Sequence, residues 1–163
     1  MQVEAVLQEI LDRQAIAGLI HAYCRHFDRN EPKALARLFT ADARVDYGPE
    51  FPDLVGRPAI EQGVARGLET LFAATSHHVS NIEIAFDGPD AARSDCYLYA
   101  WQRYCDGRPD GELWASYHHR LVRTAEGWRI ALLVLSAAGA RSFHRATMHG
   151  IGRRPAGEPE GEA

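Results

Sequence analysis

The sequence predicts a single α+β domain, in which a strongly curved, mainly antiparallel sheet wraps around three N-terminal helices. Two observations predict this fold. Apolar residues recur with a helical period in the first half of the chain, and apolar and aromatic segments separated by turns fill the second half. A cone-shaped domain of this kind can leave an apolar cavity between its helices and its sheet, where a small molecule would bind.

The helices are predicted from apolar stripes and from residues that begin or end helices. The first helix has a stripe at positions i, i+3, i+4, i+7 and i+11 and ends near "DRNEP". Asn30 is the predicted N-cap of a short second helix, with Pro32 in its first turn. The third helix is "AIEQGVARGLETLF". The first stripe consists of Ile16, Leu19, Ile20, Tyr23 and Phe27.

Turns rich in glycine, proline and aspartate separate the predicted strands. We expect one α+β barrel domain over residues 1–142. Residues 143–163 form a C-terminal extension, and the last part, "GRRPAGEPEGEA", is predicted to be disordered. The predicted strands are 43–47, 77–86, 92–105, 113–123 and 128–135.

Composition excludes several classes of protein. The chain has 163 residues, of which 46% are hydrophobic and 25% charged, with a formal net charge of −4 and no basic run. We therefore expect neither a nucleic-acid partner nor a membrane-spanning segment. The N-terminus has no signal-peptide pattern, and Cys24, Cys96 and Cys105 lack metal-type spacing, so we expect a cytoplasmic protein with reduced thiols.

Several stretches together resemble the SnoaL-like branch of the nuclear transport factor two-like superfamily. They are "IAGLIHAYCRHFDRNEPKALARLFTADARVDYG", "GRPAIEQGV", "TSHHVSNIEIAFDGPDAARSDCYLYA" and "YHHRLVRTAEGWRI", which span nearly all of residues 12–135. The family includes scytalone dehydratase, a bile-acid dehydratase, a hexachlorocyclohexane dehydrochlorinase, ketosteroid isomerase, polyketide cyclases and non-catalytic proteins. The resemblance thus implies the fold more directly than the reaction.

The resemblance implies a catalytic dyad. Dehydratase and dehydrochlorinase members pair an aspartate that ends the first helix with a histidine that opens the strand after the third helix. Asp28 in "HFDRN" matches the aspartate, and His77 matches the histidine because Asn81 follows four residues later. Tyr23, five residues before Asp28, matches a tyrosine of the bile-acid dehydratase relatives. A carboxylate that orients an imidazole leaves the other ring nitrogen free to take a proton from carbon.

The alternation of a strand raises a question about His77. On a regular strand it shares a face with Val79, Asn81 and Glu83, whereas His78 falls on the more apolar face. A β-bulge near Ser80 would resolve the conflict. His77 is therefore the predicted base, and His78 is the alternative.

Other residues are candidates for contact with a substrate. Tyr23 and Tyr47 could donate hydrogen bonds to a carbonyl or a leaving hydroxyl, or pack as ordinary aromatics. His119 is predicted either to face the cavity or to lie at the surface. Tyr97, Trp101 and Phe143 are the remaining substrate-binding candidates, although strand aromatics such as Tyr97 and Trp101 are equally suited to core or interface packing.

No metal or cofactor is expected. The chain has eight histidines, but the vicinal pairs diverge on strands and the remaining spacings do not place two on one helical face. Glycine-rich nucleotide motifs are absent from the sequence. Some relatives carry a cavity arginine after the tryptophan that corresponds to Trp128. Here that stretch reads "ALLVLSAAGAR", and Arg141 at its end is the nearest counterpart. The sequence therefore gives no support to a clamp for a carboxylate or coenzyme A.

These observations predict a cofactor-independent lyase or dehydratase that acts on a hydrophobic small molecule such as a steroid, a polyketide or an aromatic compound. One alternative is a polyketide cyclase or ketosteroid-type isomerase in which Asp28 itself moves the proton. Another is a non-catalytic module that binds a small ligand. A homodimer or higher homo-oligomer is expected from the resemblance alone.

Overall fold

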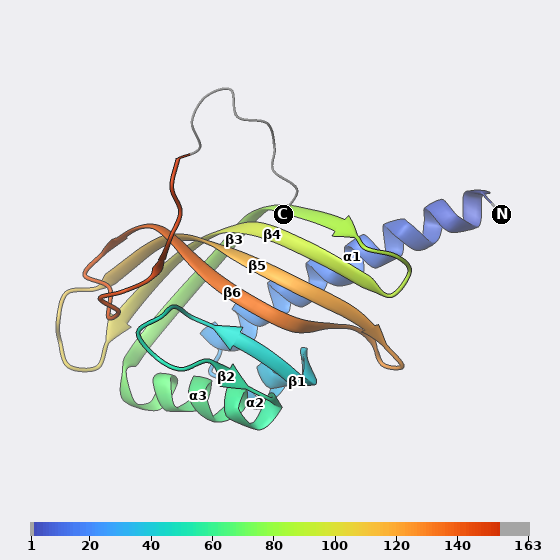
Figure 1. Ribbon diagram of the computed structural model, residues 1–163. Helices are drawn as coiled ribbons and strands as arrows, with labels where there is room; N and C mark the ends of the chain where they lie inside the picture. Colours follow the sequence, from blue (N-terminus) through green and yellow to red (C-terminus); the bar gives the residue numbers. More distant parts are fainter. Residues whose placement is uncertain (1, 154–163) are drawn as a thin grey trace.

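The computed structural model describes residues 2–153 and begins with the helices (Figure 1). They are α1 (Gln2–Asp28), α2 (Pro32–Ala36) and α3 (Arg57–Thr70). α1 begins well before its apolar stripe, and its first turns extend past the sheet in Figure 1. The expected disorder of the tail falls largely on residues 154–163, outside the described part of the chain. Within that part, no helix is long and apolar enough to cross a membrane.

The strands form one mixed sheet in the order β2-β1-β6-β5-β4-β3. The three pairings among β3, β4, β5 and β6 are antiparallel, whereas β1 and the short β7 each run parallel to β6. The strand bounds are β1 (Phe39–Asp46), β2 (Leu54–Val55), β3 (Phe72–Phe86), β4 (Ala91–Tyr104), β5 (Gly111–Thr124), β6 (Gly127–Arg141) and β7 (His149–Gly150).

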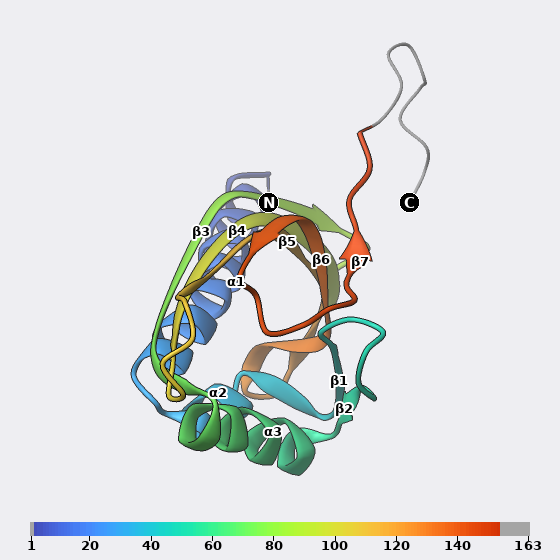
Figure 2. The same ribbon diagram turned by 90° about the vertical axis from the view of Figure 1, so that its left-hand side faces the viewer.

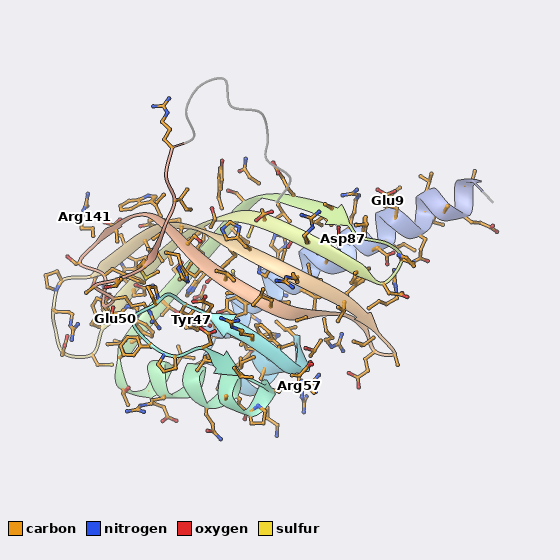
Figure 3. The ribbon with its side chains drawn as sticks, viewed as in Figure 1. Glu9, Tyr47, Glu50, Arg57, Asp87 and Arg141 are labelled. Atoms are coloured by element: carbon orange, nitrogen blue, oxygen red, sulfur yellow. The ribbon has the colours of Figure 1, made fainter. Side chains whose placement is uncertain are left out.

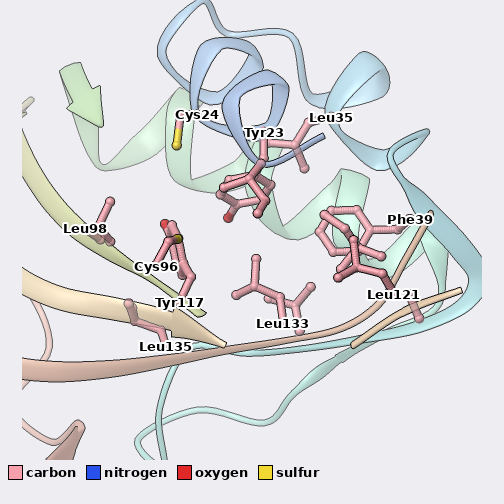
Figure 4. Close-up of a cluster of buried hydrophobic side chains, with 14 of the residues drawn as sticks. Tyr23, Cys24, Leu35, Phe39, Cys96, Leu98, Tyr117, Leu121, Leu133 and Leu135 are labelled. Carbon is pink, nitrogen blue, oxygen red and sulfur yellow. The ribbon is translucent and has the colours of Figure 1, made fainter. Parts of the chain in front are cut away.

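The sheet curls around the helices without closing, as Figure 2 shows. Ile16, Ile20 and Tyr23 of α1 are buried on its concave side, where they meet the inward-facing residues of the strands (Figure 4). The predicted α+β cone is therefore confirmed. The strands β2 and β7 were not predicted, because two residues are too few to show an alternating pattern.

The end of α1 differs from the sequence prediction. Asn30 is not the N-cap of α2; it adopts a left-handed conformation, with φ of 56°, directly after α1. The Asn30 N–H donates to Phe27 O, and the Glu31 N–H donates to His26 O, which is the Schellman pattern of a helix C-terminus. Asparagine tolerates this conformation better than most residues. The motif stops the helix just after Asp28 and turns the chain toward α2.

Asp12 connects α1 to the hairpin between β5 and β6. Its carboxylate accepts hydrogen bonds from Arg123 Nη1 at 2.9 Å, Arg123 Nη2 at 2.6 Å and Trp128 Nε1 at 2.9 Å. Only 7% of Asp12 is exposed. The hydrogen bonds from Arg123 outweigh the opposing effect of burial and lower the pKa of Asp12 to about 2.

We predict that Asp12→Asn lowers the free energy of unfolding at pH 7 by about 1–2 kcal/mol. The pKa of this carboxyl is lower in the folded than in the unfolded chain. Its contribution is therefore complete above about pH 4 and is lost as the pH falls toward about 2. In urea unfolding, the difference between wild type and variant should narrow over that interval.

The control is Glu9→Gln, which removes an exposed pairing with Arg13 on the same helix. It should change the free energy of unfolding by less than about 0.5 kcal/mol. An equal loss in both variants, or a difference that does not depend on pH, would contradict the prediction.

Candidate active site

A cavity of about 620 Å³ lies between the helices and the concave face of the sheet. Most of its wall is apolar, from α1, α3, β4, β5 and β6. The chain that follows β6 crosses the open end of the curled sheet in Figure 2 and supplies further wall residues. The polar side chains that line the cavity include Tyr23, Tyr47, His77, Gln102, Tyr117, His144 and Arg145.

Asp28 and His77 form the predicted pair at this cavity. His77 Nδ1 lies 2.6 Å from Asp28 Oδ1, and the backbone N–H of His77 donates to Asp28 Oδ2 at 2.8 Å. The hydroxyl of Thr75 also donates to Oδ1, at 2.8 Å. Because an ionised carboxylate can only accept, Nδ1 carries the proton, and Nε2 keeps its lone pair for the cavity that His77 lines.

The pair is only partly accessible to water. The side chains of His77 and Asp28 are 6% and 25% exposed. Burial raises the pKa of Asp28, but the hydrogen bonds and charge of His77, with the hydroxyl of Thr75, outweigh it, so the pKa lies below its ordinary value. Asp28 stays a carboxylate at the C-terminal end of α1, where the helix dipole disfavours negative charge.

A β-bulge in β3 explains why His77, rather than His78, faces the cavity. The pairing of β3 with β4 shifts between Ser80 and Glu83, and Asn81 takes a positive φ of 52°. The shift reverses the alternation, so that His77 lies on the same face as Ile82 and Ile84. The expected bulge is thus confirmed. The outward-facing His78 accepts or donates a 2.9 Å hydrogen bond with the Ser76 hydroxyl.

Two tyrosines form a hydroxyl pair in the same cavity. The hydroxyl groups of Tyr23 and Tyr47 are hydrogen-bonded to each other. The Tyr23 ring packs edge-on against the Tyr117 ring, with 5.6 Å between the ring centroids (Figure 4). Burial raises the pKa of Tyr47 to about 12 and that of Tyr23 well above its ordinary value. Both therefore keep their protons at neutral pH and can act as hydrogen-bond donors.

Three predicted substrate contacts lie elsewhere. Tyr97 and Trp101 are on the opposite face of β4 from the cavity-lining Leu98 and Ala100, and Tyr97 is 63% exposed. His119 is buried outside the cavity wall, its Nδ1 lies 3.0 Å from the Ser94 hydroxyl, and burial lowers its pKa to about 4. These three assignments are therefore corrected.

Phe143 does line the cavity, as predicted. Three further lining residues were not among the sequence candidates: Tyr117, His144 and Arg145. Tyr117 belongs to the "YHHR" stretch of β5. It precedes His119 by two residues, so both side chains lie on the same face of the strand. His144 and Arg145 directly follow Phe143. Burial lowers the pKa of His144 to about 4, so its imidazole is neutral at pH 7. The expectation of Arg141 as the nearest cavity arginine is corrected: Arg145 lines the cavity, and Arg141 pairs with Glu112 outside it.

Within residues 2–153, no group of three or more histidine, cysteine, aspartate or glutamate side chains could hold a metal ion. Cys24 and Cys96 are buried as free thiols, and Cys105 is exposed. The polar groups at the described cavity are the imidazole–carboxylate pair, the neutral imidazole of His144, hydroxyl groups, the Gln102 amide and the guanidinium groups of Arg66, Arg108 and Arg145.

Comparison with known families identifies the family of the chain. The profile of the SnoaL-like domain matches residues 8–134. The chain belongs to the SnoaL-like family. One relative, the uncharacterised protein Rv2910c of Mycobacterium tuberculosis, is 33% identical over 131 residues, which cover 75% of this chain and 82% of the relative. The resemblance stated from the motifs is confirmed.

Solved structures share the fold. A candidate scytalone dehydratase from Novosphingobium aromaticivorans superposes with a TM-score of 0.85 at 32% identity, over 92% of this chain and 99% of that one. A type 2 hexachlorocyclohexane dehydrochlorinase superposes with a TM-score of 0.77 at 18% identity, over 93% of this chain and 99% of that one. The latter likeness concerns the fold alone. The fold is thus one that dehydratases and lyases use.

The dyad geometry predicts the tautomer of His77. At pH 8 the neutral ring should carry its proton on Nδ1, as long-range ¹H–¹⁵N correlation spectra can show. Asp28→Ala removes the acceptor, so the ring should shift toward the Nε2–H form that free imidazoles favour. As a control, Asp46→Ala removes the carboxylate 3.0 Å from His149 Nε2 and should leave His77 unchanged. Persistence of the Nδ1–H form in Asp28→Ala would refute the assigned role of Asp28.

Proposed function

We propose that this protein is a cofactor-independent lyase of the dehydratase type, in which His77 removes a proton from carbon and Asp28 orients and stabilises the imidazole. The observation that carries the proposal is the 2.6 Å contact between His77 Nδ1 and Asp28 Oδ1 in the wall of an apolar cavity. The likeness to a candidate scytalone dehydratase at 32% identity supports it.

The proton moves from a carbon next to a carbonyl to His77 Nε2. As the imidazole becomes an imidazolium, the Asp28 carboxylate stabilises the new charge through Nδ1–H. The partial burial of the pair strengthens this interaction relative to water. The Phe27 ring lies beside the base, with 4.7 Å between its centroid and that of the His77 ring. It limits the access of water to the imidazole.

The tyrosine pair supplies the second requirement of an elimination. One hydroxyl donates to the other, and the donor that remains can face a substrate carbonyl, where negative charge develops as the proton leaves. As the enolate collapses, the carbon–oxygen bond to the β-hydroxyl group breaks, and this group takes up a proton and leaves as water. The imidazolium of His77 can return its proton at this step, so the enzyme ends the cycle unchanged.

The apolar wall favours a hydrophobic substrate. The cavity of about 620 Å³ is within the range of small-molecule sites and can hold a fused-ring compound. A steroid, polyketide or aromatic β-hydroxy ketone fits these requirements, because it offers an acidic carbon–hydrogen bond, a carbonyl and a leaving hydroxyl in one rigid body.

The proposal is tested on a panel of cyclic β-hydroxy ketones that includes scytalone. Formation of the conjugated product is followed by ultraviolet absorbance, and α-proton exchange in deuterium oxide by NMR. We expect His77→Gln to lower both rates by roughly 100-fold or more, because a general base is lost. His78→Gln is the matched control; its ring faces away from the cavity, so both rates should stay within about twofold.

Asp28→Asn separates the alternatives. If activity survives in His77→Gln but is lost in Asp28→Asn, Asp28 is itself the base, as in a ketosteroid-type isomerase or cyclase. If the wild-type protein binds the panel but none of these variants changes either rate, the chain acts as a binding module. Either result contradicts the proposed role of His77.

A further inference from the structure

Arg145 is the most unusual charged residue of the cavity wall. It follows β6, and its guanidinium carbon lies 5.6 Å from the Tyr47 ring centroid and 4.9 Å from that of Phe51. Its Nη1 is buried and has no hydrogen-bond partner among residues 2–153. A buried donor without a partner is unfavourable, and a charged donor more so. The cavity wall therefore holds a cation with a buried donor that the described protein groups do not satisfy.

The Glu50 carboxylate attracts the Arg145 guanidinium through its charge, but its hydrogen bonds go to the backbone. Glu50 Oε2 accepts hydrogen bonds from the backbone N–H groups of Ala146 at 2.7 Å and Thr147 at 3.1 Å. These bonds fix the chain just after Arg145, and no ion pair joins the guanidinium to Glu50 in the described part of the chain. Figure 3 shows Glu50 and Tyr47 near this end of the sheet.

A second cavity arginine shows the contrast. Arg108 also lines the cavity, but its Nε donates to Asp106 Oδ1 at 2.9 Å, so its charge has an acidic partner in the protein. Arg145 lies against two aromatic rings, and no acidic side chain in the described part of the chain is seen to accept a hydrogen bond from it. Burial also lowers the pKa of Arg145 below its ordinary value, and a bound anion would act in the opposite direction.

We propose that Arg145 binds an anionic oxygen group, a carboxylate or a phosphate, on the hydrophobic substrate of this cavity. The planar fork of a guanidinium matches both groups, and a charge-assisted hydrogen bond would satisfy the buried Nη1. The inference rests on the proposed function in that it takes the cavity as the substrate site. It adds the substrate class: an apolar ring system with one acidic substituent.

The position of Arg145 orients such a substrate. Tyr47 contacts both the guanidinium, through its ring, and Tyr23, through its hydroxyl. The acidic substituent therefore binds on the Tyr47 side of the cavity, and the body of the ring system extends toward β3, which carries His77. A rival role on the same geometry is that Arg145 stabilises only the oxyanion that forms during the reaction. This role gives no preference for acidic ligands before turnover.

Three probes of one shape separate the two roles: 2-naphthoate, 2-naphthyl phosphate and the neutral 2-naphthamide. We measure their dissociation constants by isothermal titration calorimetry at pH 7. The wild-type protein should bind at least one anion roughly 10- to 100-fold more tightly than the amide. Whichever anion is preferred identifies the substituent as carboxylate or phosphate.

Arg145→Met keeps the apolar stem that packs on Tyr47 and Phe51, and it should abolish the preference for the anion while leaving the affinity for the amide nearly unchanged. Arg145→Lys retains the charge without the fork and should keep part of the preference. Arg141→Met is the matched control. Arg141 pairs with Glu112 outside the cavity and its side chain is 73% exposed, so the preference should persist (Figure 3).

Equal affinity of the wild-type protein for the amide and both anions overturns the inference, as does failure of both anions to bind. Retention of the preference in a folded Arg145→Met variant does so as well. The outcome is separate from that of the elimination, since binding is read without turnover. His77→Gln should lose proton abstraction and still prefer the anion.

Discussion

The hydrogen bonds between Asp28 and His77 hold together two elements that are distant in the sequence and orient the imidazole in the cavity wall. A carboxylate at the C-terminal end of a helix is disfavoured by the helix dipole. Here it accepts bonds from the ring and the backbone of His77 and from Thr75, all at the beginning of β3. The same contacts dock the strand against the helix and set the tautomer of the imidazole. Packing and chemistry therefore depend on one carboxylate.

Two local irregularities make this contact possible. The left-handed residue Asn30 ends α1 directly after Asp28, so the carboxylate lies at the helix terminus instead of within a longer helix. The bulge at Ser80–Glu83 lets the first part of β3 turn His77 inward while the second part turns Ile82 and Ile84 inward. Without the extra residue, either the histidine or the apolar side chains would face the solvent.

The sequence predicted those parts of the fold that depend on local periodicity. The stripe from Ile16 to Phe27 identified α1, and the conflict between His77 and the apolar alternation in β3 located the bulge. The dyad came from the resemblance, because no local pattern connects residues 28 and 77. Strand alternation showed that Tyr97 and Trp101 share one face of β4. It did not show that the cavity lies on the opposite face of that strand.

What the sequence did not predict depends on tertiary contacts. Residues 143–148 have no regular period, and their path is set by the hydrogen bonds of Glu50 and by the pairing of β7 with β6. Arg145 consequently resembled an ordinary basic residue in a polar tail. His119 was placed wrongly for a related reason: strand alternation gives the face of a residue but not its position along the cone.

The segment that crosses the open end of the sheet has a bearing on how this family diversifies. Asp28 and His77 belong to α1 and β3, inside residues 8–134 that match the family profile, whereas Phe143, His144 and Arg145 lie beyond them. Under the proposals made above, proton abstraction and ligand preference would reside in separate stretches of the chain. Substitutions in the segment after β6 would then alter which ligands are accepted without touching the imidazole–carboxylate pair.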